Sequence, residues 1–217
     1  MAEPKSFLLS AELGDYLVAH GTPPDAIQAG LIAETAALGA IAGMQVAPEQ
    51  GAFLTLLAQV TGARRAIEIG TFTGYSALCI ARGLPADGRL ICCDVSEEWT
   101  SVGRPYWEKA GVANKIDLRI APALDTLAAL DGEFDFAFID ADKPNYARYW
   151  DALVPRMHPN GVILVDNVLW GGNVINPDAA DENTKAIKAF NDAIAQDDRV
   201  ETVMLPISDG LTLARRI

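Results

Sequence analysis

The sequence predicts an α/β fold, a doubly wound and mostly parallel sheet of seven strands. Two observations favour it. Short apolar segments alternate with helical ones from residue 65 onward, separated by short loops, and this order is typical of βαβ units. Half of the residues (50%) are hydrophobic, enough for a sheet covered on both faces. The 217 residues suit a single domain. We expect residues 1–60 to form a helical extension and residues 61–217 the sheet.

Three helices are expected before the sheet. Ser10 can cap a helix that runs toward His20. Residues 22–25 then begin a second helix, whose apolar side chains recur at helical spacing through Leu38. Pro48 stands where the first turn of a third helix tolerates a proline.

The alternating part of the chain follows. Strands are expected at residues 65–70, 89–94, 115–120, 134–140, 161–166, 200–205 and 211–217. Helices are expected between them at residues 76–82, 97–110, 124–130, 146–157 and 184–195. The stretch from His158 to Gly161 is typical of a turn, as is the stretch from Pro206 to Gly210. The second turn predicts that the last two strands form an antiparallel hairpin at the edge of the sheet.

Charge and composition exclude several classes of function. The formal net charge is −12, which disfavours binding to nucleic acid or to an anionic membrane. No apolar run is long enough to span a bilayer, and residues 1–10 lack the features of a signal peptide. The three cysteines, Cys79, Cys92 and Cys93, are too few for a disulfide framework. We expect them to be buried and reduced, with Cys92 and Cys93 on opposite faces of a strand, in a cytoplasmic protein.

Polar residues follow the strands at one edge of the expected sheet. They are Glu68 and Gly70, Asp94, Asp140, and Asp166 with Asn167. Ligands of open α/β sheets bind at this edge.

The loop from Gly70 to Gly74 is neither a dinucleotide fingerprint nor a P-loop, since Phe72 replaces a required glycine and no lysine follows. It suits a nucleoside without phosphates, with Asp94 accepting hydrogen bonds from ribose. An ordinary tight turn beside a solvated Asp94 is the alternative.

Five segments carry a family pattern: residues 44–51, 68–76, 139–143, 166–170 and 209–212. In these segments the chain resembles the class I S-adenosylmethionine-dependent methyltransferases. Within that class it is similar to the cation-dependent O-methyltransferases of the catechol and caffeoyl-CoA group. The resemblance covers nearly all of the chain from Met44 onward. It implies a Rossmann-like methyltransferase fold and transfer of a methyl group to a hydroxyl of a vicinal dihydroxy aromatic.

The resemblance also implies where S-adenosylmethionine binds. The implied contacts are Met44, Val46, Glu68, Gly70, Thr71, Ser76, Asp94, Ala123 and Asp140. Asp94 would hold the ribose and Ala123 would lie near the adenine. The sequence departs from the family pattern at Ala121, where glycine is common, and at Val46, where a hydroxyl residue is frequent.

A divalent cation is expected beside the cofactor. Asp140, Asp166 and Asn167 offer three oxygen ligands, which suit magnesium, with manganese and calcium as alternatives. The only histidines are His20 and His158, so a zinc site is not expected. In the alternative interpretation, Asp166 and Asn167 cap a loop and Asp140 bonds to the backbone.

Lys143 and Asp140 are the predicted catalytic residues. The resemblance assigns Lys143 the role of accepting the hydroxyl proton or stabilising the phenolate, against the alternative of a surface lysine. Lys143, Asn167 and Trp170 are expected to contact the substrate, with ordinary packing as the alternative for Trp170. A hydroxycinnamoyl compound or its CoA ester is an alternative substrate, although basic residues are scarce before Arg64.

Other functions stay open at this point. A non-catalytic S-adenosylmethionine-binding protein would keep the cofactor residues without turnover. A nicotinamide-dependent oxidoreductase is disfavoured by the missing glycines, and a hydrolase by the missing nucleophile elbow after Gly74. The resemblance further implies a homodimer, whose interface the apolar N-terminal helices could bury.

Overall fold

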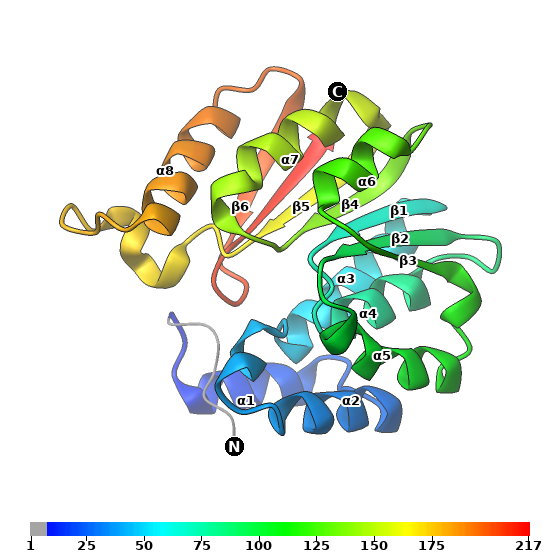
Figure 1. Ribbon diagram of the computed structural model, residues 1–217. Helices are drawn as coiled ribbons and strands as arrows, with labels where there is room; N and C mark the ends of the chain where they lie inside the picture. Colours follow the sequence, from blue (N-terminus) through cyan, green and yellow to red (C-terminus); the bar gives the residue numbers. More distant parts are fainter. Residues whose placement is uncertain (1–7) are drawn as a thin grey trace.

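A computed structural model describes residues 8–217, so most of the segment examined for a signal peptide lies outside the described residues. It contains one sheet of seven strands in the order β3-β2-β1-β4-β5-β7-β6 (Figure 1). The strands are β1 (Arg65–Ile69), β2 (Arg89–Asp94), β3 (Ile116–Ile120), β4 (Phe134–Ile139), β5 (Met157–Asp166), β6 (Val200–Leu205) and β7 (Leu211–Arg216). β1 to β5 run parallel, and β7 pairs antiparallel with both β5 and β6. The predicted fold class and terminal hairpin are thereby confirmed.

Eight α-helices accompany the sheet in the described part of the chain. They are α1 (Ala11–His20), α2 (Ala26–Ala36), α3 (Pro48–Thr61), α4 (Tyr75–Gly83), α5 (Glu97–Lys109), α6 (Ala123–Ala129), α7 (Tyr146–Leu153) and α8 (Glu182–Ile194). Five short 3₁₀ helices are η1 (Gly39–Met44), η2 (Ala113–Lys115), η3 (Lys143–Asn145), η4 (Val154–Arg156) and η5 (Trp170–Ile175). No helix among residues 8–217 has the length and apolar character that crossing a membrane requires.

Local sequence signals explain where the first three helices begin. The Ser10 side chain accepts a hydrogen bond from the backbone of Leu13 at the start of α1. Asp25 and Gln28 form a capping box at the start of α2. Pro48 occupies the first turn of α3, where its missing N–H would have no helical partner. All three predicted helices are confirmed.

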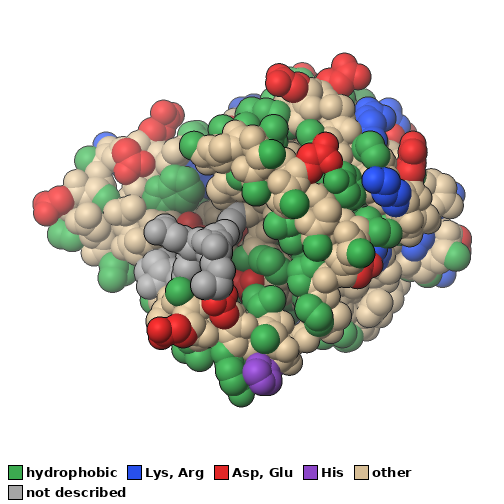
Figure 2. All heavy atoms as spheres, turned by 90° about the horizontal axis from the view of Figure 1, so that it is seen from below, with side chains coloured by type: hydrophobic (Ala, Val, Ile, Leu, Met, Phe, Trp, Pro, Cys, Tyr) green, Lys and Arg blue, Asp and Glu red, His purple; other side chains and the backbone are tan. Residues whose placement is uncertain are grey.

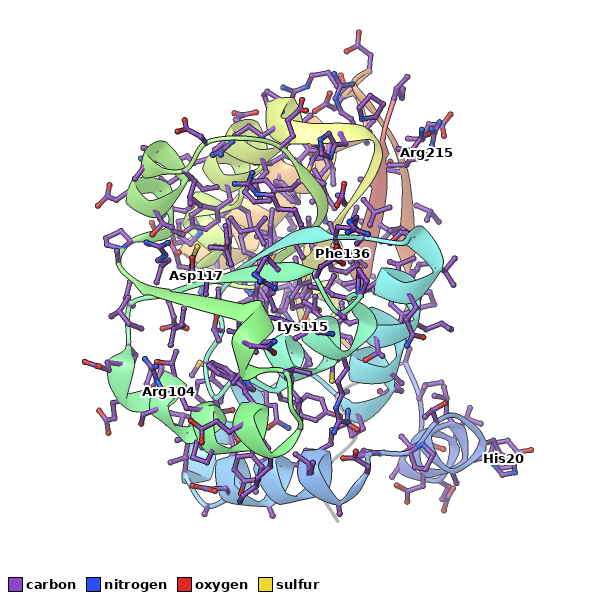
Figure 3. All side chains as sticks on the ribbon, turned by 90° about the vertical axis from the view of Figure 1, so that its right-hand side faces the viewer. His20, Arg104, Lys115, Asp117, Phe136 and Arg215 are labelled. Atoms are coloured by element: carbon purple, nitrogen blue, oxygen red, sulfur yellow. The ribbon has the colours of Figure 1, made fainter. Side chains whose placement is uncertain are left out.

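Helices cover both faces of the sheet, as Figure 1 shows. α6, α7 and α8 pack on one face around a core that includes Cys93, and α3, α4 and α5 pack on the other around a core that includes Cys92. The two cysteines thus point to opposite faces, and all three are buried and free, as predicted. Phe136, in the middle of β4, belongs to the second core (Figure 3).

The structure corrects two predicted boundaries. The helix expected over residues 146–157 ends as α7 at Leu153, and η4 replaces its last turn. The turn expected from His158 to Gly161 lies inside β5, which begins at Met157. Phe134 pairs with Met157 and Phe136 pairs with Val162, so the turn residues bulge out of a strand that resumes its pairing beyond them.

The strand order places the functional edge. β2 and β3 extend the sheet on one side of β1, whereas β4 and β5 extend it on the other. The order in which the chain adds strands therefore reverses between β1 and β4, with β2 and β3 on one side of this pair and β5 on the other. Such a switch point leaves a crevice at the carboxyl ends of the strands.

Candidate active site

A cavity of about 830 Å³ opens at the carboxyl ends of the strands. It brings together every residue that the sequence assigned to cofactor, cation or substrate except Glu68: Met44, Val46, Gly70, Thr71, Ser76, Asp94, Ala123, Asp140, Lys143, Asp166, Asn167 and Trp170. Figure 2 shows a hollowed face of the molecule, with acidic and hydrophobic side chains around the hollow and most of the visible basic ones away from it.

The loop after β1 is shaped by two glycines. Gly70 has φ +89°, and a Cβ there would collide with the carbonyl oxygen of Asp140. Gly74 has φ +81°, and its Cβ would collide with the ring of Trp107. Both residues are therefore required by the packing of the protein itself, and Gly70 in particular lets the ends of β1 and β4 meet.

Asp94 anchors the same loop to the end of β2. Its Oδ2 accepts hydrogen bonds from the backbone of Thr71 at 2.9 Å and of Phe72 at 2.8 Å, and its Oδ1 accepts one from Ser96 at 2.8 Å. A carboxylate has about four lone-pair sites, so one remains for a ligand hydroxyl. Asp94 thus orders the loop whether or not it also holds a ribose.

Glu68 lies behind the cavity and does not line it. Its side chain is fully buried on β1, and neither carboxylate oxygen has a hydrogen-bond partner of normal geometry. Burial raises the pKa of Glu68 to about 7, against the pull of the nearby hydroxyls of Ser76 and Thr71. The role of Glu68 in binding the cofactor stays a prediction.

Lys143 is the centre of the charged part of the cavity. It lies in η3, just after β4, and only 8% of its surface is exposed. Its Nζ donates to Asn167 Oδ1 at 2.6 Å, to Asp140 Oδ1 at 3.1 Å and to the Tyr146 hydroxyl at 2.6 Å. The alternative of a solvated surface lysine is excluded by this burial.

The predicted cation ligands meet at this point. Asp140 and Asn167 share the Lys143 ammonium group, and Asp166 Oδ1 accepts a hydrogen bond from the backbone of Asn167 at 2.7 Å. Burial, and then the neighbouring charge of Asp140, raise the pKa of Asp166 to about 7. Two carboxylates and an amide oxygen that lie this close together form a donor set that a divalent cation would fit.

The donor set holds no histidine or cysteine. In residues 8–217, no three side chains of His, Cys, Asp or Glu gather as metal ligands. His20 projects from α1 at the edge of the molecule (Figure 3). His158 pairs with Asp135 and Glu133, outside the cavity lining.

The loop after β5 carries strained backbone. Asn167 and Trp170 have φ of +57° and +48°, a region that residues other than glycine rarely adopt. Asp209 Oδ1 holds the loop by accepting a hydrogen bond from the backbone of Gly171 at 2.6 Å. This strain aims Asn167 at Lys143 and brings Trp170 to the cavity wall.

Several site residues were missed by the sequence reasoning. Phe72 and Trp99 line the cavity as an edge-to-face pair 5.4 Å apart. Gln50 is fully buried, and its amide lowers the pKa of Asp166. Tyr146 contacts Lys143 from inside the core. The spacing of Tyr146 three residues after Lys143 was a usable signal, because such residues lie one turn apart in a helical segment.

The chain is similar to known proteins over almost its whole length. The sequence profile of a family described as O-methyltransferase matches residues 22–217. The chain belongs to this O-methyltransferase family. The resemblance seen in the five sequence segments is confirmed.

Individual proteins of known sequence or structure are also similar to this chain. Tricin synthase 2 of Oryza sativa subsp. japonica is 46% identical over 186 residues, which cover 80% of this chain and 64% of that protein. Caffeoyl-CoA O-methyltransferase 2 of Zea mays is 43% identical over 186 residues, 80% of this chain and 70% of that protein. An O-methyltransferase of Bacillus cereus, solved in complex with SAH, is 34% identical with a TM-score of 0.86 and covers 95% of this chain and 97% of its own.

Proposed function

We propose that this O-methyltransferase moves a methyl group from S-adenosylmethionine to a hydroxyl of a vicinal dihydroxy aromatic, assisted by a divalent cation. The observation that carries the proposal is the convergence of Asp140, Asn167 and Lys143 in one cavity. The complex of the Bacillus cereus relative with SAH supports the choice of cofactor.

The cofactor half of the cavity lies toward β1 and β2. Gly70, Thr71, Ser76 and Asp94 line it on one side, and Met44 at the end of η1 and Val46 in the link to α3 line it on the other. Five carboxylates line the whole cavity, namely Asp94, Asp140, Asp142, Asp166 and Asp209. An excess of negative charge favours a cofactor that carries a sulfonium.

The catalytic half is built around Lys143. When bound, S-adenosylmethionine supplies an electrophilic methyl group and a divalent cation on Asp140, Asp166 and Asn167 supplies Lewis acidity that favours the ionised hydroxyl. After one ammonium proton has left to solvent, the neutral Lys143 Nζ accepts the hydroxyl proton as general base, and the ammonium that results stabilises the phenolate. Trp170, whose ring centroid lies 5.7 Å from Lys143 Nζ, would shield the reacting atoms from water, which favours a reaction in which opposite charges cancel.

The charged side chains that line the cavity also favour some substrates over others. Among the described lining residues, Lys143 is the single cation and none is an arginine. We therefore expect an uncharged or cationic vicinal diphenol to be preferred over a CoA ester, whose phosphates would meet carboxylates. The CoA ester stays the second candidate because the Zea mays relative is named for it.

A methylation assay tests both points. The protein is incubated with S-adenosylmethionine, magnesium and either a free vicinal diphenol or its CoA-linked form, and products are identified by mass. We expect methylation of the free diphenol, abolished by a chelator and restored by added magnesium, manganese or calcium. Undiminished turnover with a chelator would overturn the role of the cation, and cofactor binding without turnover on any phenol would favour a non-catalytic protein.

Three further predictions stay proposals. We infer that the chain acts in the cytoplasm as a homodimer. We also infer that residues 1–60 and 61–217 form one domain. An oxidoreductase or a hydrolase is not supported, since the chain belongs to the O-methyltransferase family.

A further inference from the structure

Tyr146 is a buried residue of the site to which the proposed reaction assigns no role. It is the first residue of α7 and is fully buried. Its ring packs edge-to-face against Phe190 at 5.6 Å, and its hydroxyl donates to the backbone carbonyl of Asp166 at 3.2 Å. The hydroxyl has one proton, so toward Lys143 it acts as an acceptor.

The three acceptors around Lys143 are not equivalent. An ammonium group has three N–H bonds, and the described acceptors are Asp140, Asn167 and Tyr146. Asp140 and Asn167 are proposed cation ligands, so their oxygens are engaged once a cation binds. Tyr146 is not a proposed cation ligand, so its hydroxyl can still accept the hydrogen bond from Lys143 when a cation is bound.

We propose that Tyr146 is the positioning residue that holds Lys143 in place when a divalent cation takes over Asp140 and Asn167. The hydrogen-bond chain runs from Lys143 Nζ to the Tyr146 hydroxyl and on to the carbonyl of Asp166. It ties Lys143 to the backbone at the end of β5, where Asp166 and Asn167 lie. The position of Lys143 relative to these two residues is thereby set by β5 and α7. This inference rests on the proposed function, because it assumes the cation and the role of Lys143.

The test removes only the hydroxyl. Tyr146→Phe keeps the ring against Phe190, and Tyr106→Phe is the matched control, because that exposed hydroxyl bonds to Glu34 away from the cavity. We expect kcat of Tyr146→Phe to fall about tenfold to hundredfold, the effect of losing one hydrogen bond to a charged group. The KM for the diphenol and the Kd for S-adenosylmethionine should change less than about twofold, and Tyr106→Phe should equal the wild type.

A double-mutant cycle separates positioning from a structural role. In a Lys143→Met background, Tyr146→Phe should cause no further loss of kcat, because the residue through which it acts is gone. An equal loss in both backgrounds would overturn the inference, as would full activity of Tyr146→Phe. A variant with a collapsed melting temperature and lost cofactor binding would count against it too, since that outcome assigns Tyr146 to folding.

Crystal structures give a readout that does not depend on turnover. With magnesium bound, Lys143 should stay on Tyr146 in the wild type and lose its fixed position in Tyr146→Phe. Without metal, it should keep Asp140 and Asn167 in both proteins. An unmoved Lys143 in metal-loaded Tyr146→Phe would refute positioning while leaving the methyl transfer intact, whereas a wild type that binds magnesium but methylates nothing would refute the proposed function alone.

Discussion

Lys143 is the single residue on which the proposed chemistry depends most. A buried charge costs stability unless it is paired, and the Lys143 ammonium is paired with Asp140 and hydrogen-bonded to Asn167 and Tyr146. The same contacts direct Lys143 toward Asp140 and Asn167, two of the proposed cation ligands. We therefore expect its replacement to affect the reaction more than the fold.

Replacing this lysine should separate catalysis from binding. Lys143→Met should lower kcat by about 10²-fold to 10⁴-fold, the usual contribution of a general base, while S-adenosylmethionine still binds. Steady-state kinetics and calorimetric titration measure the two quantities. Lys109→Met, which alters an exposed lysine outside the cavity, is the control. Retention of the full rate at neutral pH would remove Lys143 from the mechanism.

Glu68 makes the ligand-free protein sensitive to pH. Burial raises its pKa from 4.5 to about 7, so the folded state favours the protonated form. The contribution of the protonated Glu68 side chain to folding stability is complete below pH 4.5. It is lost as the pH rises toward 7, because this carboxyl group ionises at a lower pH in the unfolded chain than in the folded protein. The difference between the two pKa values corresponds to about 3 kcal/mol of folding free energy.

A neutral isostere should remove this effect. At pH 8, Glu68→Gln should melt several degrees higher than the wild type, since about 1 kcal/mol shifts Tm by roughly 2–4 °C at this size. At pH 4 the two proteins should melt alike. Thermal unfolding across pH checks this, and a constant difference between the two curves would show that Glu68 is charged or paired in the folded state.

At the level of elements, the contact between the loops after β1 and β4 shapes the site most. Gly70 lets them touch, and Asp94 fastens the first of them to β2. The sequence predicted the glycine as a place where backbone approaches a ligand. The structure shows that the close partner is the backbone of Asp140.

Two alanine substitutions isolate that contact. Gly70 and Gly62 both have positive φ, at +89° and +64°, but a Cβ at Gly62 would meet nothing within 4 Å. Gly62→Ala should cost only the backbone penalty of about 1–2 kcal/mol, whereas Gly70→Ala should cost clearly more and weaken cofactor binding. Chemical denaturation and titration compare them. Equal losses in the two variants would mean that the junction can shift to admit a side chain.

On the scale of the whole molecule, α1 has an uncovered apolar side. None of its residues is buried, and Leu13, Tyr16 and Leu17 are exposed by 51%, 60% and 43%. Apolar side chains gain free energy when they leave water. A second copy of the chain is the occupant that the family resemblance implies.

Charged residues on α1 should therefore prevent association. We expect the wild type to be a dimer by light scattering and Leu13→Glu/Leu17→Glu to be a monomer. Val203→Glu, on the edge strand β6 where this side chain is also exposed, should stay a dimer. A monomeric wild type would contradict the prediction, and a dimeric Leu13→Glu/Leu17→Glu variant would place the interface elsewhere.

The sequence by itself determined the order and type of the elements, and which polar residues follow the strands. Periodicity, caps such as Ser10 and Asp25, and strand-ending acids such as Asp140 are local signals, so they can be read along the chain. Local signals failed at residues 157–161, where pairing with β4 extends β5 through a bulge.

Only the tertiary structure decided how the site residues share their bonds. That Glu68 is buried without a hydrogen-bond partner, that Asp94 holds a loop, and that the hydroxyl of Tyr146 reaches both Lys143 and Asp166 depend on how the chain packs. Burial and hydrogen-bond pairing come from packing in three dimensions, and the pKa values of buried groups follow from both. A sequence pattern specifies which groups are near the edge of a sheet, and packing decides which of them face the ligand.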